Sequence, residues 1–396
     1  MTEKNNYHWE ILVNDQKKHC FFGYYDRCPW NKDTQLHLAI RTIQRKRLPL
    51  RGETAEIGVV NRKEKKFIKI TETRAWCHQQ GSMTVWLNPE KNIFSFNDYC
   101  VKSQKIISRI WSVEQGECGR MEYPVYAISP DRRYAAGLNF SRIPRRGYSY
   151  ADAVLDKKPL RLQQDGIFLT RISTRKTNLI VNYERLLDMH PLPYEIKNKH
   201  IWLNHIIFNS NSKKLLFLLR HTADTDKPYP WQTYMFTVNI DGSDLRCVLP
   251  DVYWRNGTIS HQIWGRTPHE ILVDAAWGSA QKNEAVVFDE RKSPVCAQKL
   301  SAGFGVMSHM VFSPDGKQIA SDTYPDSRGK QKICLINSST GQVKTIGYFR
   351  HPAVPVIDVR CDLHPRWSAD SRLITIDTMH KGLTAIMMCD FKKNEG

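Results

Sequence analysis

The chain has 396 residues and is strongly basic, with 58 Lys and Arg against 40 Asp and Glu and a formal net charge of +18. Hydrophobic residues make up 41% and aromatic residues 11%, a composition that fits a folded globular protein and excludes a disordered one. No run approaches the roughly 20 apolar residues that span a bilayer, and the first residues lack the pattern of a secretory signal. We therefore expect a cytoplasmic protein without a membrane span.

The ten cysteines are scattered and no two form a CxxC pair, which argues against a zinc finger or a thioredoxin-type site. In a reducing cytosol we expect most of them to be thiols. The positive charge would attract polyanions such as nucleic acid, acidic membranes or acidic sugars. Because the basic residues are dispersed and no nucleic-acid motif accompanies them, we do not expect a nucleic-acid partner. A basic surface that only confers solubility is the alternative.

A strand end, a tight turn and a second strand recur along the whole chain, as in Phe312 to Asp322, where the turn reads Pro-Asp-Gly. In chain order the copies lie at residues 29–40, 86–97, 128–138, 208–218, 263–274, 312–322 and 367–377. Most are followed by two further short strand-like runs. Seven copies, most of them about 40 to 57 residues apart, predict seven four-stranded blades.

We therefore predict one all-β domain over residues 1–396, a seven-bladed β-propeller with TolB- or WD40-like blades. No helical periodicity of useful length competes with this interpretation. The chain ends after the third strand of its last blade, so residues 9–13 are expected to supply the fourth strand and close the ring. Residues 139–166 and 184–203 exceed the needs of one blade and are expected to form long loops over one face.

Four histidines occupy the same place in four consecutive repeats, each three residues before an aromatic residue. They are His205, His261, His309 and His364. In a ring of blades, residues of equal phase face one another around the axis, so we expect these histidines at one mouth of the central channel. Imidazoles gathered in this way suit manganese, iron, zinc or nickel, and the residue types do not choose among them.

Three carboxylates support this arrangement, because Asp274, Asp322 and Asp377 each follow a blade histidine by 13 residues. Folding the hairpin about its turn places the two positions opposite each other. A carboxylate beside an imidazole fixes its tautomer and strengthens it as a metal ligand. The alternative is that such pairs only lock adjacent turns, although their absence from the first three blades favours a metal site.

Two segments carry a family resemblance. Residues 260–264 read Ser-His-Gln-Ile-Trp, and residues 359–365 read Val-Arg-Cys-Asp-Leu-His-Pro. They resemble blade openings of the oligogalacturonate lyases, of the types Thr-His-Glu-Phe-Trp and Gln-x-x-His-Pro-His-Pro. The starts at Asn204-His205 and Ser308-His309, and the tyrosine-rich residues 22–30, are similar to segments of the same family. The chain also resembles uncharacterised propellers linked with bacterial surface-polysaccharide gene clusters.

Members of that family are cytoplasmic seven-bladed propellers that cleave short pectin fragments by β-elimination with manganese. The resemblance implies a divalent metal, Mn²⁺, held by the four phased histidines together with Asp362, which replaces the first histidine of the last-blade motif. Val359 stands where the family has a ligating Gln and is unable to bind metal. The position of the family's catalytic arginine falls near Asp165 and Gly166, where this chain has no arginine.

Elimination at a uronic acid needs a cation on the carboxylate and groups that move protons. Arginines pair with carboxylates through two hydrogen bonds, and aromatic rings stack on sugars. We predict catalytic roles for Arg142, Arg220 and Tyr148, and substrate-binding roles for Arg146, Arg366, Tyr24, Tyr25 and Gln80. Asp26 and Tyr324 are further candidates. Each of these residues has a plain alternative as a solvated charge or a packing ring.

The leading hypothesis is a metal-dependent enzyme on an acidic oligosaccharide, a lyase that acts by β-elimination at a uronic acid. One alternative is a non-catalytic scaffold or glycan-binding propeller, and another is a metal-dependent sugar hydrolase or epimerase. Metal content separates the first two, and ultraviolet absorbance of an unsaturated product separates a lyase from the third. The sugar, its linkage and the oligomeric state stay open.

Overall fold

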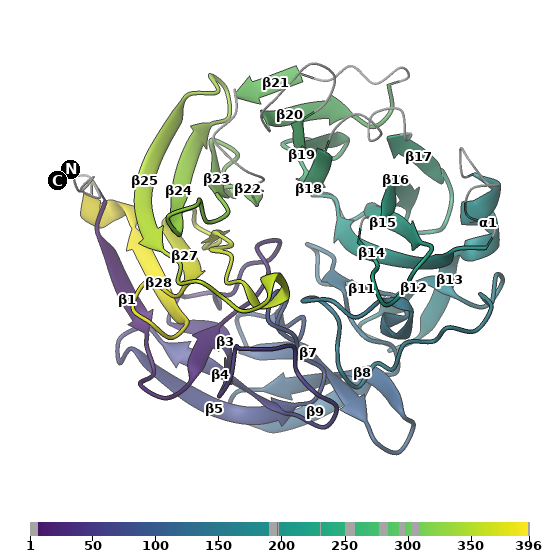
Figure 1. Ribbon diagram of the computed structural model, residues 1–396, viewed down its shortest axis with the longest axis horizontal. Helices are drawn as coiled ribbons and strands as arrows, with labels where there is room; N and C mark the ends of the chain where they lie inside the picture. Colours follow the sequence, from purple (N-terminus) through teal and green to yellow (C-terminus); the bar gives the residue numbers. More distant parts are fainter. Residues whose placement is uncertain are drawn as a thin grey trace.

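The computed structural model describes residues 7–189, 196, 198–229, 231–249, 258–276, 284–292, 298–301 and 309–394. Within these residues, seven four-stranded antiparallel sheets are arranged in a ring (Figure 1). The predicted all-β, seven-bladed propeller is therefore confirmed. None of the helices in the described part of the chain is long and apolar enough to cross a membrane. The cysteines in that part form no disulfide, as expected.

Each blade takes its strands in chain order from the first to the fourth. Blades one to three consist of β2 (His19–Phe21), β3 (Leu36–Thr42), β4 (Ala55–Asn61) and β5 (Lys66–Thr73); β6 (Val85–Asn88), β7 (Ile93–Cys100), β8 (Lys105–Ser112) and β9 (Gly116–Met121); β10 (Ala127–Ile128), β11 (Tyr134–Gly137), β12 (Gly166–Arg171) and β13 (Thr177–Asn182).

Blades four to six consist of β14 (His200–Phe208), β15 (Lys214–Thr222), β16 (Gln232–Asn239) and β17 (Arg246–Leu249); β18 (Thr258–Trp264), β19 (Glu270–Ala276), β20 (Glu284–Asp289) and β21 (Gln298–Ser301); β22 (Met310–Phe312), β23 (Gln318–Asp322), β24 (Lys330–Asn337) and β25 (Val343–Arg350). The described helical segments are η1 (Phe140–Arg142), α1 (Tyr183–Asp188), η3 (Ile357–Val359) and η4 (Phe391–Asn394).

Blade seven joins the two ends of the chain. Its strands are β26 (Arg366–Trp367), β27 (Leu373–Thr378), β28 (Ala385–Asp390) and β1 (Trp9–Val13). Strand β1 is antiparallel to β28, with Trp9 opposite Cys389 and Ile11 opposite Met387. The prediction that the N-terminal run supplies the missing fourth strand is confirmed. The closed ring leaves no blade without a neighbour on either side.

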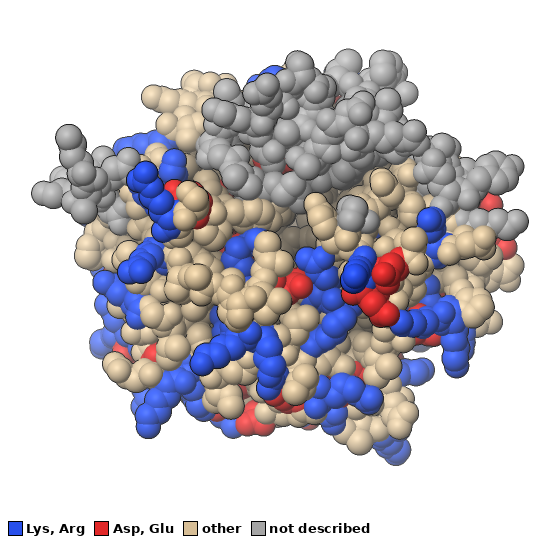
Figure 2. Space-filling model, in the orientation of Figure 1, with Lys and Arg blue, Asp and Glu red and all other residues tan. Residues whose placement is uncertain are grey.

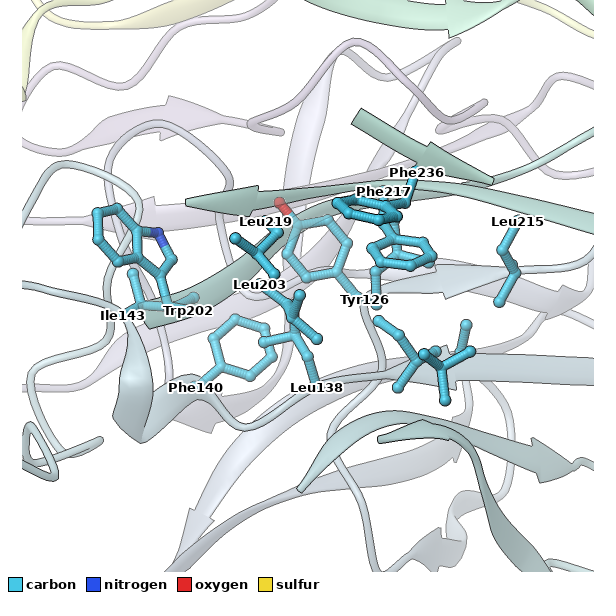
Figure 3. Close-up of a cluster of buried hydrophobic side chains, with 14 of the residues drawn as sticks. Tyr126, Leu138, Phe140, Ile143, Trp202, Leu203, Leu215, Phe217, Leu219 and Phe236 are labelled. Atoms are coloured by element: carbon cyan, nitrogen blue, oxygen red, sulfur yellow. The ribbon is translucent and has the colours of Figure 1, made fainter. Parts of the chain in front are cut away.

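Strand β15 shows how neighbouring blades are held together. It is apolar over most of its length and all nine of its residues are buried, as expected for a strand covered on both faces. One face, with Leu215, Phe217 and Leu219, belongs to the core cluster drawn in Figure 3. The other face, with Leu216 and Leu218, packs with apolar residues of β18 to β20 in blade five. Each sheet is thus packed between two others.

The structure contains one of the two predicted long loops but not the other. Residues 139–166 form an irregular insertion between β11 and β12 that begins with η1. The predicted loop 184–203 is not one loop, because α1 extends to Asp188 and β14 already begins at His200. Residues 190–195 and 197 lie outside the described residues. Only the first insertion therefore remains as a long irregular segment.

Candidate functional site

The structure brings the phased histidines together. The ring centroids of His261 and His309 are 4.1 Å apart, and those of His309 and His364 are 4.2 Å apart. His205 joins the group through Tyr24, whose ring centroid lies 5.3 Å from that of His205 and 5.2 Å from that of His364. All four histidines are buried. We call these four residues the histidine cluster.

The backbone explains why these side chains leave the regular alternation of their strands. His205, His261 and His364 have left-handed conformations, with φ of 53°, 53° and 47°. The pairing of β14 with β15 and of β18 with β19 shifts at the first two of them, as at a β-bulge, which redirects a side chain. A non-glycine residue held in this region costs about 1–3 kcal/mol and is typical of functional sites. The same conformation at three equivalent positions indicates that the direction of the imidazole matters there.

Two histidines and one carboxylate have the geometry of a metal site. One ligand atom from each of His309, Asp362 and His364 lies within 4.8 Å of the others. Burial lowers the pKa of His364 to about 3, with His309 nearby adding to the effect, and burial also lowers the pKa of His309 well below its usual range. Burial alone would raise the pKa of Asp362, but the Arg360 guanidinium beside it lowers that pKa below its usual range. Neutral imidazoles and an ionised carboxylate are the forms that bind a divalent cation.

A buried carboxylate orients both of these imidazoles. Asp322 accepts hydrogen bonds from the backbone N–H of His309 at 2.8 Å, from Nδ1 of the same residue at 2.9 Å, and from the backbone N–H of His364 at 2.9 Å. Nδ1 of His364 donates to the carbonyl of Gly23 at 2.6 Å. With both Nδ1 atoms used as donors, each Nε2 is left as the unprotonated atom that would bind a metal.

The predicted histidine–aspartate pairs hold only in part. His309 pairs with Asp322 as expected. Nδ1 of His261 lies 3.6 Å from Oδ2 of Asp274, beyond a hydrogen bond. The third pair is wrong, because Asp377 accepts from the guanidinium of Arg366 at 2.9 and 3.0 Å. The arginine two residues after His364 takes the carboxylate that the hairpin geometry had given to the histidine.

The tyrosine-rich segment of blade one reaches the histidine cluster. The hydroxyl of Tyr24 lies 3.0 Å from Nδ1 of His205, and the ring centroid of Tyr25 lies 5.1 Å from that of His309. Gly23 makes this approach possible, because its φ is +119° and a Cβ there would lie 2.7 Å from the backbone of Gln80. Both tyrosines lie at the cluster as predicted, and both are almost fully buried.

Gln80 is connected to the histidine cluster through other residues. Its Nε2 donates to the hydroxyl of Tyr126 at 3.2 Å, and that hydroxyl donates to Oδ1 of Asn204 at 2.7 Å. The same Oδ1 accepts the backbone N–H of His205 at 2.8 Å. This chain of hydrogen bonds helps to position His205, and the substrate contact of Gln80, which is 3% exposed, stays a prediction.

Arg220 and Tyr148 lie together beside His205. The guanidinium carbon of Arg220 is 4.9 Å from the ring centroid of Trp231, and its Nε has no hydrogen-bond partner. Burial lowers the pKa of His205, and the positive charge of Arg220 adds to that effect. The hydroxyl of Tyr148 is buried next to Arg220; burial raises its pKa, and the charge of Arg220 opposes the rise. The structure thus gathers two of the three predicted catalytic residues next to the histidines.

Two other predicted arginines are occupied by the protein itself. Arg142 donates to the carbonyls of Asp156 at 2.7 Å and of Lys158 at 2.9 Å, and so holds the insertion together. Arg366 is 0% exposed, is paired with Asp377 and also donates to the carbonyl of Gly23. Both guanidinium groups therefore have structural contacts in the protein. The catalytic role of Arg142 and the substrate contact of Arg366 stay predictions.

Arg360 was missed in the sequence although it lies inside the last-blade motif. It donates to the two carboxylate oxygens of Asp362 at 2.6 and 3.0 Å. Its guanidinium carbon lies 3.8 Å from the ring centroid of Tyr324, whose hydroxyl is 3.3 Å from Nε2 of His261. The candidate Tyr324 is therefore at the cluster. Trp231 was missed because no repeat or motif marks it.

Together, the ring of blades and the histidine cluster define a seven-bladed propeller with a site built from four consecutive blades. No protein-family model matches the chain, and no curated protein matches its sequence. Solved structures do match. An oligogalacturonate lyase from Vibrio parahaemolyticus has a TM-score of 0.63 and 13% identity over 97% of this chain and 96% of that one. An oligogalacturonate lyase in complex with manganese has a TM-score of 0.65 and 13% identity over 97% and 93%.

The likeness to these lyases extends over almost the whole chain and shows that the fold is the same seven-bladed propeller. The tricorn protease is also similar, with a TM-score of 0.52 and 10% identity over 96% of this chain but 35% of its own length. Since a lyase and a protease share the architecture, the chemistry has to be argued from the site.

Proposed function

We propose that the chain is a cytoplasmic, metal-dependent enzyme that acts on acidic oligosaccharides as a lyase, by β-elimination at a uronic acid. The observation that carries the proposal is the group of His309, Asp362 and His364, whose ligand atoms lie within 4.8 Å of one another in the protonation states that bind a cation. The solved oligogalacturonate lyase with manganese supports Mn²⁺ as the metal.

The donor set fits such a metal. Two Nε2 atoms with their Nδ1 hydrogens already engaged, and one carboxylate, form a mixed nitrogen and oxygen set that suits Mn²⁺ and similar ions. His261 and His205 are the further donors of the same cluster. When bound, the metal would act as a Lewis acid on the uronate carboxylate and make the neighbouring C–H more acidic.

Elimination passes the C–H proton to a base and delivers a proton to the leaving oxygen. The residues beside His205 would handle the developing charge and the second of these proton transfers. The guanidinium of Arg220 can stabilise the negative charge that develops on the sugar. The hydroxyl of Tyr148, whose pKa burial raises, stays protonated and can donate to the leaving glycosidic oxygen. The basic surface supports an acidic substrate, because Lys and Arg side chains are spread over the face seen in Figure 2 with fewer Asp and Glu among them.

The test is metal content together with product formation. Protein purified without added metal should bind about one Mn²⁺ per chain in a calorimetric titration, and His309→Ala and His364→Ala should each abolish that binding. His380→Ala, which changes a histidine of the β27–β28 turn, is the matched control and should bind normally. Incubation with a uronate oligosaccharide should produce the ultraviolet absorbance of an unsaturated uronate. Absence of metal binding, or binding that survives both variants, would reject the proposal.

Two alternatives make different predictions, and the first has support in the structure. Asp322 bridges His309 and His364, as a purely structural lock of two blades would, and a scaffold of this kind would bind no metal. A metal-dependent hydrolase or epimerase would bind the metal and consume the sugar without new ultraviolet absorbance.

A further inference from the structure

A cavity of 540 Å³ lies between blade two and the long insertion of blade three. Its walls come from the β7–β8 hairpin, the segment after β9 and both halves of the insertion, and they include Leu138 and Phe140 of the core cluster in Figure 3. None of the described residues that line it belongs to the histidine cluster. Small-molecule sites usually have volumes of about 300–1,000 Å³, so the cavity is large enough to hold a ligand.

One wall of the cavity is apolar and aromatic. Ile106, Ile107 and Phe168 line it and are buried. Tyr123 also lines it and stacks on Phe168, with ring centroids 4.2 Å apart and ring planes 25° apart. Tyr123 is 38% exposed, so part of its ring stays open at the mouth of the cavity. An open aromatic ring beside an apolar wall can stack on a flat ring of a ligand.

The polar part of the cavity contains a buried carboxylate whose hydrogen-bond donors are both neutral. Asp165 is 8% exposed. Its oxygens accept hydrogen bonds from Nδ2 of Asn139 at 2.8 Å and from the backbone N–H of Gly166 at 2.7 Å. Burial raises the pKa of Asp165 above its usual range, and the negative charge of Asp156, which also lines the cavity, adds to the rise.

The buried cation of the cavity wall does not neutralise these carboxylates. The charge of Arg142 opposes the rise in the pKa of Asp165, but its guanidinium donates to backbone carbonyls at 2.7 and 2.9 Å. The buried and partly buried lining residues thus carry two carboxylates and one guanidinium. Lys105 and Arg161 also line the cavity but are exposed, where solvent and salt screen their charges. A cation that enters the cavity would therefore be favoured.

We propose that this cavity is a binding site for a small molecule that combines a flat aromatic ring with a primary amine. The ring stacks on Tyr123, and the ammonium group pairs with the carboxylate of Asp165 through a charge-assisted hydrogen bond. Because the ligand contacts both blade two and the insertion, its binding stabilises the insertion against the ring of blades. The site is independent of the proposed function, since it shares no residue with the proposed metal site.

The test uses tryptamine as the probe and tryptophol, in which a hydroxyl replaces the amine, as the neutral control ligand. Calorimetry at pH 7 should give one tryptamine per chain, bound about tenfold more tightly than tryptophol. Asp165→Asn should lower the affinity for tryptamine to that for tryptophol and leave the affinity for tryptophol unchanged. Asp224→Asn, which changes an exposed carboxylate of another loop, is the matched control and should leave both affinities unchanged.

A second variant tests the aromatic part of the site without disturbing a buried group. Tyr123→Ser should weaken the binding of both compounds, whereas Tyr229→Ser, at another exposed tyrosine, should weaken neither. Equal affinity of the wild-type protein for the two compounds, or tryptamine binding that survives both Asp165→Asn and Tyr123→Ser, would overturn the site. If the protein binds no Mn²⁺ but binds tryptamine as expected, the proposed function falls and this site stands.

Discussion

Two buried arginines, one in blade seven and one in blade four, are treated in opposite ways by the fold. Arg366 is fully buried and its charge is answered by Asp377 and by the carbonyl of Gly23. Arg220 is 8% exposed and has no ion pair among the described residues. A buried cation with its counter-charge holds a structure together, whereas one without it is ready to receive an anion. The two arginines thus differ in their counter-charge: Arg366 has one in Asp377, and Arg220 has none among the described residues.

The largest effect is expected when the ion pair between Arg366 and Asp377 is broken. Arg366→Met removes the cation and leaves the carboxylate of Asp377 buried without its partner, which should lower the free energy of unfolding by about 3–5 kcal/mol. Denaturant titration measures this loss. A loss below about 1 kcal/mol would show that the backbone N–H groups of Phe22 and Gly23 satisfy the carboxylate alone.

The backbone at Gly23, whose N–H donates to Asp377, should be the next most sensitive. Gly23→Ala places a methyl group 2.7 Å from the backbone of Gln80 and Gly81 in a conformation that alanine disfavours. We expect destabilisation of about 1–3 kcal/mol and loss of the contact between Tyr24 and His205. Thermal unfolding and Mn²⁺ titration check the two parts, and Gly316→Ala, where a Cβ meets nothing within 4 Å, controls for the change of residue.

Arg220→Met is the matched substitution at the arginine that has no ion pair among the described residues. Because it removes a buried charge that has no counter-ion, stability should change by less than about 1 kcal/mol, apart from the lost contact with Trp231. Binding of a uronate trisaccharide should fall at least tenfold, as measured by calorimetry. A stability loss as large as that of Arg366→Met would show that the two buried arginines contribute equally to stability, against this prediction.

The effect with the smallest slope concerns a third buried arginine, Arg45, which donates to the carbonyls of Val359 at 3.0 Å and of Arg360 at 2.9 Å. Burial, with the charge of Arg45 adding to it, lowers the pKa of His78 to about 3 from 6.5. As pH falls from 6.5 towards 3, His78 binds a proton in the unfolded chain but stays neutral in the folded chain. The free energy of unfolding therefore decreases in that pH range. His78→Gln should reduce this loss by at most about 1.4 kcal/mol per pH unit in denaturant titrations. An unchanged slope would contradict the assignment.

The sequence predicted the ring because its signals are local. The strand–turn–strand copies depend on turn chemistry and alternation, and these survive in every blade that the structure describes. The convergence of the histidines followed from equal phase in equivalent repeats. The left-handed backbone at His205, His261 and His364 was not predictable, since nothing in the residue types announces a bulge.

The errors arose where two candidates compete for one partner. Asp377 stands opposite the blade-seven histidine in the hairpin, yet the longer side chain of Arg366 reaches it first. Arg142 was predicted to be catalytic from its place in the insertion, but the insertion folds back so that its guanidinium donates to the carbonyls of Asp156 and Lys158. Trp231 gained its importance only from residues about 11 and 85 positions away, a contact that no local pattern encodes.

The pairing of β1 with β28 has a consequence for folding during synthesis of the chain. Strand β1 is made before its partner β28, so it stays without that partner while the other six blades are made. During that wait it is a template for other chains, as any free strand edge is. The histidine cluster is completed at the same stage, because His364 lies just before the first strand of the blade that β1 closes. Yield of active protein should therefore depend on how well the nascent N-terminal strand is shielded.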